Sequence, residues 1–376
     1  MLRPPQPRVL SRSARRTCVR PSAARAAPES ASFTAAPSAD AATVKDRAKA
    51  GLLGAVLADV ATMPLHWHYD KGEILRKLRK EPNGPLQALT GLLFADKSPL
   101  DLDALAPEFF EPPGNMFYTY APGTLSPYGA EAAGLVRSVA KHGALVPEKY
   151  AEESAAEFRA YPGRLNSISK TYLAQWDAGA RWPSCGVAGD TQAHCLVRVP
   201  CIVARYAGKP ELRTAVADAV SVHQAHPAPG DYALAYAALL ERIVLGASLA
   251  DALKWAAFDK ANPLYDEQRK MAQDALAELG NDSRDIVSKY GVSCSLPGPF
   301  VGPLAIVFGA SGDFTAAVRA NIVAGGDSCS RAAVVGGLCG AAGGMAALPP
   351  AWRAKVNDWQ ELEAAADAIV AAAGYA

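Results

Sequence analysis

The sequence predicts an all-α protein, a single compact multi-helix domain, and three observations lead to this prediction. Long stretches of the 376 residues repeat hydrophobic side chains at helical spacing, and the alternating pattern of a half-buried strand is almost absent. The connections are short and are marked by proline or glycine. No linker rich in proline and glycine separates two cores, so residues 44–376 are expected to form one domain.

The first predicted helix covers residues 47–63, with Asp46 as its expected N-cap. Its glycines and alanines favour close contact with another helix. Residues 70–84 follow as an amphipathic helix. Residues 107–127 are rich in proline, aromatic residues and glycine, which predicts a long loop, and such a loop inside a compact domain is often functional.

Helical spacing continues along the rest of the chain. Pro200 is expected to kink or split one of these helices, and the loop SCSLPGPF that begins at Ser293 is expected to precede another. A helix of small residues is expected to begin at Asp327, after the glycine pair of VAGGDSCS. The other predicted helices are 130–143, 148–161, 191–206, 211–224, 231–246, 248–259, 266–279, 314–326 and 359–373.

The charge is distributed unevenly, because the first 28 residues hold seven arginines and no acidic residue. A segment rich in arginine, serine and alanine and lacking acids is typical of an organellar transit peptide. We therefore predict that residues 1–43 are a transit peptide and linker that direct the protein to the chloroplast stroma. The mitochondrial matrix is the alternative destination, and a basic arm that binds nucleic acid is the alternative role.

The remaining 31 basic and 37 acidic residues make the body mildly acidic, so binding to nucleic acid is not expected. No uninterrupted apolar run of membrane-spanning length is present, which predicts a soluble protein without membrane partners. Six cysteines follow the leader without a CxxC pair and are expected to be reduced.

Several polar residues interrupt apolar segments. Asp59 lies inside the first predicted helix, where a charge is costly unless it is paired, and the aromatic cluster HWHY, which includes His66, Trp67 and Tyr69, follows the end of that helix. These residues form either a pocket wall with ionisable groups or a packed helix end, with Asp59 capping a neighbouring backbone. In TLSPYG, Ser126 can cap a helix that brings Tyr128 into its first turn.

The stretch GDTQAHCLVR holds Asp190, Gln192 and His194 at the start of an apolar helix. They are candidates for ligand binding, although capping alone accounts for Asp190. His223 and His226 have a spacing at which two histidines can share zinc, but no third ligand is evident nearby. Histidines at a helix C-terminus also interact favourably with the helix dipole.

In GGDSCSR, the glycines place Asp327 at a helix start, where a carboxylate can bind magnesium. Ser330 adds a weak hydroxyl ligand, whereas Cys329 is soft and a poor one. Asp327 could equally be an N-cap, with Ser330 pointing back into the helix. Cys329 could also have a lowered thiol pKa at this helix N-terminus.

Together, the motifs PLHWHYD, TLSPYG, DTQAHCL, SCSLPGPF and ANIVAGGDSCSRAAVVGGLCGA, in this order, resemble the ADP-ribosylglycohydrolase family. Within the family they are most similar to the J-crystallin and selenoprotein J branch. The resemblance covers residues 47–345 and implies an all-α fold with a ligand cleft between helices, where the family binds two magnesium ions.

The resemblance also implies that the metal site has been remodelled. Asp59 and Pro64 keep the family's first motif, but His66 occupies the position of its glutamate. The second motif, Thr-Asp-Asp-Thr, corresponds to a stretch without a carboxylate. In the third, Asp327 is kept while Cys329 and Ser330 replace an aspartate and a threonine. Magnesium on Asp327 and Ser330 therefore stays an open expectation.

Three functions are compatible with these residues. The first is hydrolysis of an ADP-ribosyl or related N- or O-glycosidic bond, with Asp327 stabilising charge and His66 or His194 as general base. The second is metal-independent binding of a nucleotide-like small ligand, and the third is a structural role like that of the crystallins. The residues expected to contact the ligand are Asp59, Trp67, Tyr69, Tyr128, Asp190, Gln192, Cys329 and Arg331.

Overall fold

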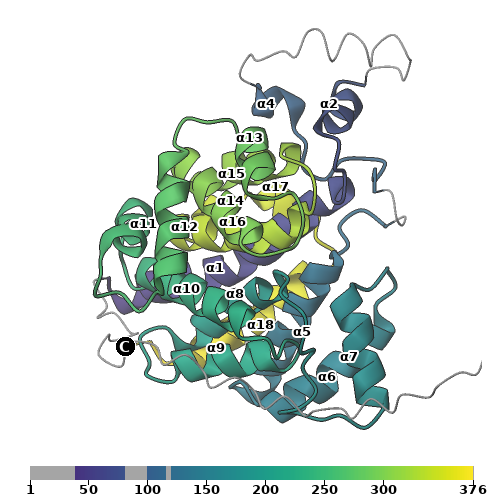
Figure 1. Ribbon diagram of the computed structural model, residues 1–376, viewed down its shortest axis with the longest axis vertical. Coiled ribbons are helices and arrows are strands. Elements are labelled where there is room, and N and C mark those ends of the chain that lie inside the picture. The colour runs from purple at the N-terminus through teal and green to yellow at the C-terminus, as the bar shows by residue number, and fades with distance from the viewer. Residues whose placement is uncertain (1–38, 81–99, 116–119, 376) are drawn as a thin grey trace, which may run out of the picture.

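The computed structural model describes residues 39–80, 100–115 and 120–375. Within these ranges the regular structure is helical, and the β-type pairing is limited to three isolated bridges. The all-α prediction is therefore confirmed. Figure 1 shows one body in which the helices stack in layers around α1.

The helices are mostly short, and proline or a polar cap begins many of them. They are α1 (Ala41–Thr62), η1 (Met63–Leu65), α2 (Lys71–Arg79), α4 (Leu102–Leu105), α5 (Pro127–His142), α6 (Pro147–Ala160), α7 (Ser167–Asp177), α8 (His194–Tyr206), α9 (Leu212–Ser221), α10 (Pro227–Val244), α11 (Leu249–Phe258), α12 (Asp266–Ala277), α13 (Ser283–Tyr290), α14 (Gly298–Gly309), α15 (Phe314–Val323), α16 (Ser328–Gly343), η2 (Met345–Ala347), α17 (Pro350–Arg353) and α18 (Trp359–Ala373).

Helix α1 lies at the centre of the fold and packs most extensively against α16, with further contacts to α8, α18, α5 and α10. Close approach between α1 and α16 depends on glycine: a Cβ built on Gly54 would lie 2.4 Å from the Gly336 carbonyl oxygen. These two helices carry Asp59 and Asp327, so their crossing fixes the two carboxylates relative to one another.

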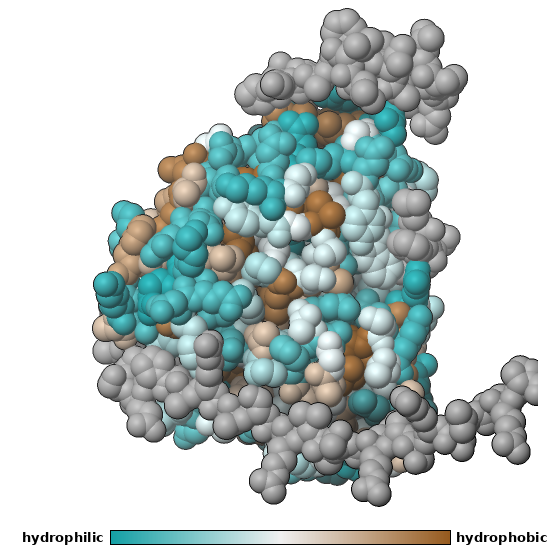
Figure 2. All heavy atoms as spheres, viewed as in Figure 1, coloured by the Kyte–Doolittle hydropathy of each residue, from teal (hydrophilic) through white to brown (hydrophobic). Residues whose placement is uncertain are grey.

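The segment Ala41–Leu65 is long and apolar enough to cross a membrane by length and composition alone. The sequence analysis did not expect such a segment. Of its most apolar window, 94% is buried inside the fold. It therefore serves here as the core helix of a helical domain. Figure 2 shows that the viewed surface is mainly hydrophilic, with hydrophobic residues in small scattered groups.

Some predicted boundaries were wrong, because caps and tertiary contacts shift helix ends. Helix α1 begins at Ala41 with Asp40 as its N-cap, whereas Asp46 accepts a hydrogen bond from the Met345 backbone N–H at 3.2 Å. Helix α8 begins at His194, so Asp190 is not its cap. Helices α7 and α13 were not predicted.

Candidate functional site

Two glycines bring Asp327 to the start of α16. Gly325 and Gly326 have φ values of 72° and 69°, and a Cβ on Gly326 would lie 2.3 Å from the Val292 carbonyl oxygen. Only glycine fits this conformation and this space. The backbone is held on both sides, since Gly326 N–H donates to the His68 carbonyl at 2.6 Å and Asp327 N–H donates to Val292 at 2.7 Å.

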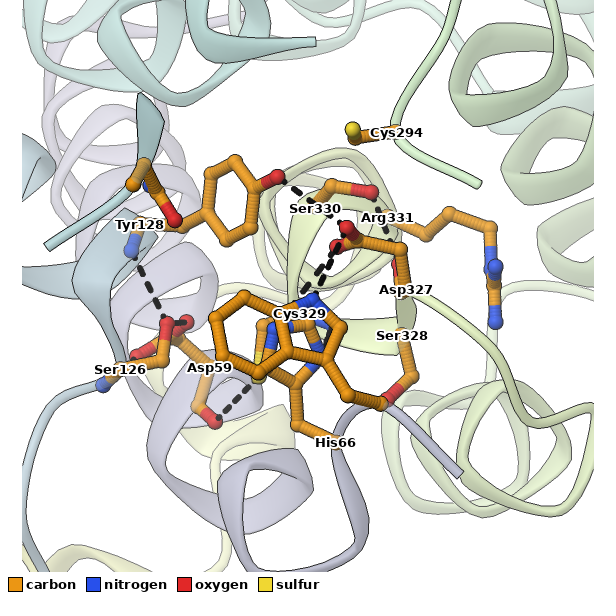
Figure 3. Close-up of polar contacts among 12 residues, drawn as sticks. Asp59, His66, Ser126, Tyr128, Cys294, Asp327, Ser328, Cys329, Ser330 and Arg331 are labelled. Carbon is orange, nitrogen blue, oxygen red and sulfur yellow. Dashed lines mark hydrogen bonds and ion pairs between the residues drawn. The ribbon is translucent and has the colours of Figure 1, made fainter. Parts of the chain in front are cut away.

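Asp327 is buried, and its two carboxylate oxygens have different contacts. Oδ2 accepts hydrogen bonds from the Trp67 indole N–H at 3.1 Å and from the Tyr128 hydroxyl at 3.2 Å. Oδ1 has no hydrogen-bond partner among the described residues and lies 3.8 Å from Nε2 of His66. Figure 3 shows the Tyr128 hydroxyl and the His66 ring directed at this carboxylate from different elements.

His66 is fully buried and follows η1. Its Nδ1 accepts a hydrogen bond from the Cys329 backbone N–H at 3.2 Å, and its ring stacks on Trp67 at a centroid distance of 4.5 Å. Burial lowers the pKa of His66 to about 4, so the imidazole is neutral near pH 7. Because Nδ1 is an acceptor, the proton of the neutral ring is on Nε2, the atom that faces Asp327.

Asp59 joins α1 to the start of α5. Its carboxylate accepts hydrogen bonds from the Ser126 backbone N–H at 2.9 Å and from the Ser126 hydroxyl at 2.5 Å. Ser126 in turn caps α5 by accepting from the N–H groups of Tyr128 and Gly129. Burial raises the pKa of Asp59 to about 6, which reflects the cost of a charge inside an apolar helix. The interpretation of Asp59 as a cap on neighbouring backbone therefore describes its contacts.

His194 belongs to a buried polar network beside Tyr128, on which its ring stacks at 4.9 Å. Its Nδ1 is 2.9 Å from Glu131, and Glu131 also accepts from Arg198 at 3.0 Å and from Asn166 at 3.1 Å. Burial alone would raise the pKa of Glu131, but these partners, His194 first, outweigh it and leave the pKa below its ordinary value. Nε2 of His194 has no partner among the described residues.

The sequence analysis missed Glu131 and Arg198. Both are charged residues on otherwise buried helix faces, and Arg198 lies one helical turn after His194. A charge on an apolar face requires a partner, so this pattern was the available signal.

Other predicted site residues lie around this centre. Gln192 accepts a hydrogen bond from the Cys294 thiol at 3.1 Å, and Asp190 accepts from Gln192 N–H and from Gln224. Asp190 thus holds the loop before α8 in place. Tyr69 is 49% exposed, and nearby Asp327 contributes, after burial, to raising its pKa to about 12.

Arg331 is fully buried on the first turn of α16. It donates to the Asn321 side chain at 2.9 Å and to the Gly325 carbonyl. Burial lowers the pKa of Arg331 to about 10, so the guanidinium keeps its charge at neutral pH. Cys329 is also buried, and burial raises its thiol pKa, so the expectation of a lowered pKa was wrong.

The two histidines considered for zinc have other surroundings. His226 caps α10 by accepting from the Ala228 N–H at 3.2 Å. His223 is buried against the rings of Tyr150, Phe158 and Tyr172. The structure therefore places the pair in separate roles.

The residues present do not fit magnesium. Both oxygens of Asp59 accept from Ser126, and the Ser330 hydroxyl donates to the Asp327 backbone carbonyl at 2.8 Å. Among the described residues of this centre, Oδ1 of Asp327 is the one carboxylate oxygen without a hydrogen-bond partner, whereas magnesium requires several hard oxygens. In the described part of the chain, no three His, Cys, Asp or Glu side chains are grouped to hold a metal ion.

The fold and the site define an all-helical protein with a buried carboxylate and imidazole where α1, α5 and α16 meet. The sequence profile of the ADP-ribosylglycohydrolase family matches residues 40–375, and the chain belongs to this family. The resemblance stated from the motifs is thereby confirmed.

Curated relatives and solved structures agree with this assignment. Crystallin J1A of Tripedalia cystophora is 27% identical over 85% of this chain and 94% of its own length. Crystallin J1B of the same organism is 26% identical over 87% of this chain and 97% of its own length. A structure titled ADP-ribosylglycohydrolase-related protein complex has a TM-score of 0.62 at 20% identity, covering 88% of this chain and 99% of that chain, and it supports the fold.

Proposed function

We propose that this protein binds an ADP-ribose-like ligand and hydrolyses an N- or O-glycosidic bond of it without magnesium. The observation that carries the proposal is a pair of buried atoms 3.8 Å apart, Oδ1 of Asp327 and Nε2 of His66, neither of which has a hydrogen-bond partner among the described residues. Buried polar atoms without partners are rare in folded proteins and call for an explanation, which a bound ligand supplies.

The chemistry follows from the charges. Glycosidic hydrolysis passes through an oxocarbenium-like transition state, which a nearby carboxylate stabilises. Asp327 supplies that carboxylate, while the rings of Trp67 and Tyr128 border it. Water adds to the anomeric carbon as the glycosidic bond breaks, its proton passes through Asp327, and the leaving atom takes the electron pair and that proton.

This assignment changes the role of His66. A ring whose Nδ1 accepts a hydrogen bond and whose Nε2 carries the proton acts as a donor. His194 has the opposite arrangement, because its Nδ1 contacts Glu131 and its Nε2 has no partner among the described residues. Nε2 of His194 is therefore able to accept a proton, but in the step above Asp327 takes the proton of the water and His66 orients the oxygen that reacts.

A structural role is the second candidate, favoured by the similarity to Crystallin J1A and J1B over most of the chain. The buried carboxylates of Asp59 and Glu131 support it, because both are engaged in hydrogen bonds that join helices. On this alternative the fold is retained without any ligand.

Calorimetric titration with ADP-ribose tests the proposal, with magnesium present and with magnesium chelated. We expect binding of equal affinity in both conditions and at least tenfold weaker binding by Asp327→Asn. Asp367→Asn is the matched control, because Asp367 is on the surface. If the wild-type protein binds ADP-ribose neither with magnesium nor with magnesium chelated, the structural role is favoured.

We also propose that residues 1–43 direct the protein to the chloroplast stroma. Seven arginines without an acid in residues 1–28 support this proposal. Residues 1–38 lie outside the described residues, and α1 begins at Ala41, within the proposed leader and linker. A fluorescent protein fused to residues 1–43 should enter chloroplasts in algal cells, and entry into mitochondria would support the alternative.

A further inference from the structure

We propose that Nε2–H of His66 and Oδ1 of Asp327 together hold one hydroxyl-type oxygen, and that this pair replaces the divalent cations used elsewhere in the family. The inference rests on the proposed function, because it names the group of the ligand or solvent that the same site takes. It adds that the site excludes divalent cations.

The pair consists of one donor and one acceptor. The Cys329 backbone N–H occupies Nδ1 of His66, which leaves the ring proton on Nε2. The donors of Trp67 and Tyr128 occupy Oδ2 of Asp327, which leaves only Oδ1 open. Both open atoms belong to side chains that are at least nine-tenths buried, and neither has a partner among the described residues.

The spacing of the pair suits an oxygen between the two atoms. At 3.8 Å, Nε2 and Oδ1 are too far apart for a direct hydrogen bond. An oxygen ~2.8 Å from each would make both bonds at an angle of about 85°. Such an oxygen accepts from His66 and donates to Asp327, which water and a sugar hydroxyl can both do.

The same atoms disfavour a divalent cation. The positive end of the Nε2–H bond faces the space where a cation on Oδ1 would lie. The buried guanidinium of Arg331 adds a positive charge that acts on both His66 and Asp327. One carboxylate oxygen faces these two positive groups. The local electrostatics therefore favour a neutral group that both donates and accepts a hydrogen bond over a divalent cation.

Nuclear magnetic resonance on the full chain with ¹⁵N-labelled histidine tests the pair before any ligand is known. We expect a neutral His66 ring with its proton on Nε2, assigned by the signal that His66→Gln removes. Addition of millimolar Mn²⁺, which broadens signals near a bound ion, should leave this ring unaffected. A proton on Nδ1, or broadening of the His66 ring by Mn²⁺, would overturn the inference.

Two further measurements distinguish the sources of the oxygen. If a ligand hydroxyl occupies the pair, an ADP-ribose analogue that lacks this hydroxyl should bind the wild-type protein at least tenfold more weakly than ADP-ribose does. The same analogue should bind Asp327→Asn as well as it binds the wild-type protein. If water occupies it, the analogues bind the wild-type protein normally, and Asp327→Asn lowers kcat at least tenfold. Both results support the pair, whereas normal analogue binding with unchanged turnover in Asp327→Asn contradicts it.

A failure of the proposed function gives a different pattern. If ADP-ribose does not bind at all while the His66 ring has its proton on Nε2 and ignores Mn²⁺, the ligand assignment is wrong and the pair stands. In the binding and turnover measurements, His66→Gln is the matched variant for Asp327→Asn, because the glutamine amide can donate a hydrogen bond in place of Nε2–H.

Discussion

Asp59 and His66 are buried ionisable residues whose pKa values are shifted in opposite senses. The pKa of Asp59 is raised to about 6 and that of His66 is lowered to about 4, each chiefly by burial. The contribution of Asp59 to the free energy of unfolding is fully present below pH 3.8, its ordinary pKa, and is lost as the pH rises through about 6. The contribution of His66 to the free energy of unfolding is fully present above pH 6.5, its ordinary pKa, and is lost as the pH falls through about 4. Each shift corresponds to about 3 kcal/mol.

Because these contributions oppose one another, Asp59→Asn should increase the sensitivity of the fold to acid. The amide can keep the hydrogen bond from the Ser126 N–H and donate to the Ser126 hydroxyl, so the fold should survive. Between pH 7 and pH 4, the free energy of unfolding of the variant should fall by on the order of 2–3 kcal/mol relative to that of the wild-type protein. Urea unfolding across this range measures it, and parallel curves would contradict the assignment of Asp59.

Gly129 is required for the contact between Asp59 and Ser126. A Cβ at this position would lie 2.0 Å from Oδ2 of Asp59. We expect Gly129→Ala to displace the carboxylate and lower the unfolding free energy by about 3 kcal/mol, through overpacking and loss of buried hydrogen bonds. Gly134→Ala on the same helix is the control, since its Cβ would make only an ordinary contact at 3.6 Å with Glu157. Equal stability of the two variants in thermal unfolding would refute this explanation.

At the scale of elements, the crossing of α1 and α16 has the least space for change. A Cβ on Gly54 would meet the Gly336 carbonyl oxygen at 2.4 Å, and one on Gly336 would meet the Gly54 carbonyl at 2.1 Å. The neighbouring atoms are backbone, so relief requires the helices to separate.

Gly54→Ala should therefore destabilise the protein by at least about 3 kcal/mol, or prevent its folding. It should also weaken ligand binding, because separation of α1 from α16 moves Asp59 and His66 relative to Asp327. Gly230→Ala in α10 is the control, as its Cβ would meet nothing within 4 Å and should gain up to about 1 kcal/mol from helix propensity. Denaturant unfolding compares the two, and a neutral Gly54→Ala would contradict the close crossing.

Helix prediction succeeded where the helices are long, as in α10 with 18 residues and α18 with 15. It failed at α7 and α13. Only three of the eleven residues of α7 are buried, and only two of the eight residues of α13. Such short helices span only two or three turns, which leaves few apolar positions to reveal the period, and they depend on packing against the rest of the fold.

At the scale of the whole molecule, the packed domain begins close to Asp40. Ala39 N–H donates to the Leu245 carbonyl at 3.2 Å, and Asp40 caps α1 through the Thr43 N–H. The family profile begins at residue 40 as well.

A chain that starts at Ser38 should therefore have the melting temperature of the full chain within about 2 °C. A chain that starts at Asp46 removes the cap and first turn of α1, including the buried Val44, and should melt several degrees lower. The N-cap contributes about 1 kcal/mol and the burial of Val44 about 1.5–3 kcal/mol, and each kcal/mol shifts Tm by roughly 1.5 °C for a domain of this size. Calorimetry on both chains and on the full chain measures this. Equal melting of all three would show that residues 38–45 contribute nothing to the domain.

The sequence by itself determined the all-helical class, the family and the main candidate residues. Helical periodicity depends on neighbours three and four positions away, and motifs such as PLHWHYD and GGDSCS are contiguous. Both can therefore be recognised from the sequence alone. The prediction that His66, Cys329 and Ser330 replace ligands of the family rests on the same contiguous motifs.

Only the tertiary structure decided what each candidate residue contacts. It showed that Asp59 is engaged by Ser126, 67 residues away, and that Glu131 and Arg198 complete the network of His194. It also showed that, within the described part of the chain, Oδ2 of Asp327 accepts hydrogen bonds while Oδ1 has no partner. The physical reason is that a hydrogen bond depends on the distance and angle between atoms far apart in the chain, and helix packing sets both.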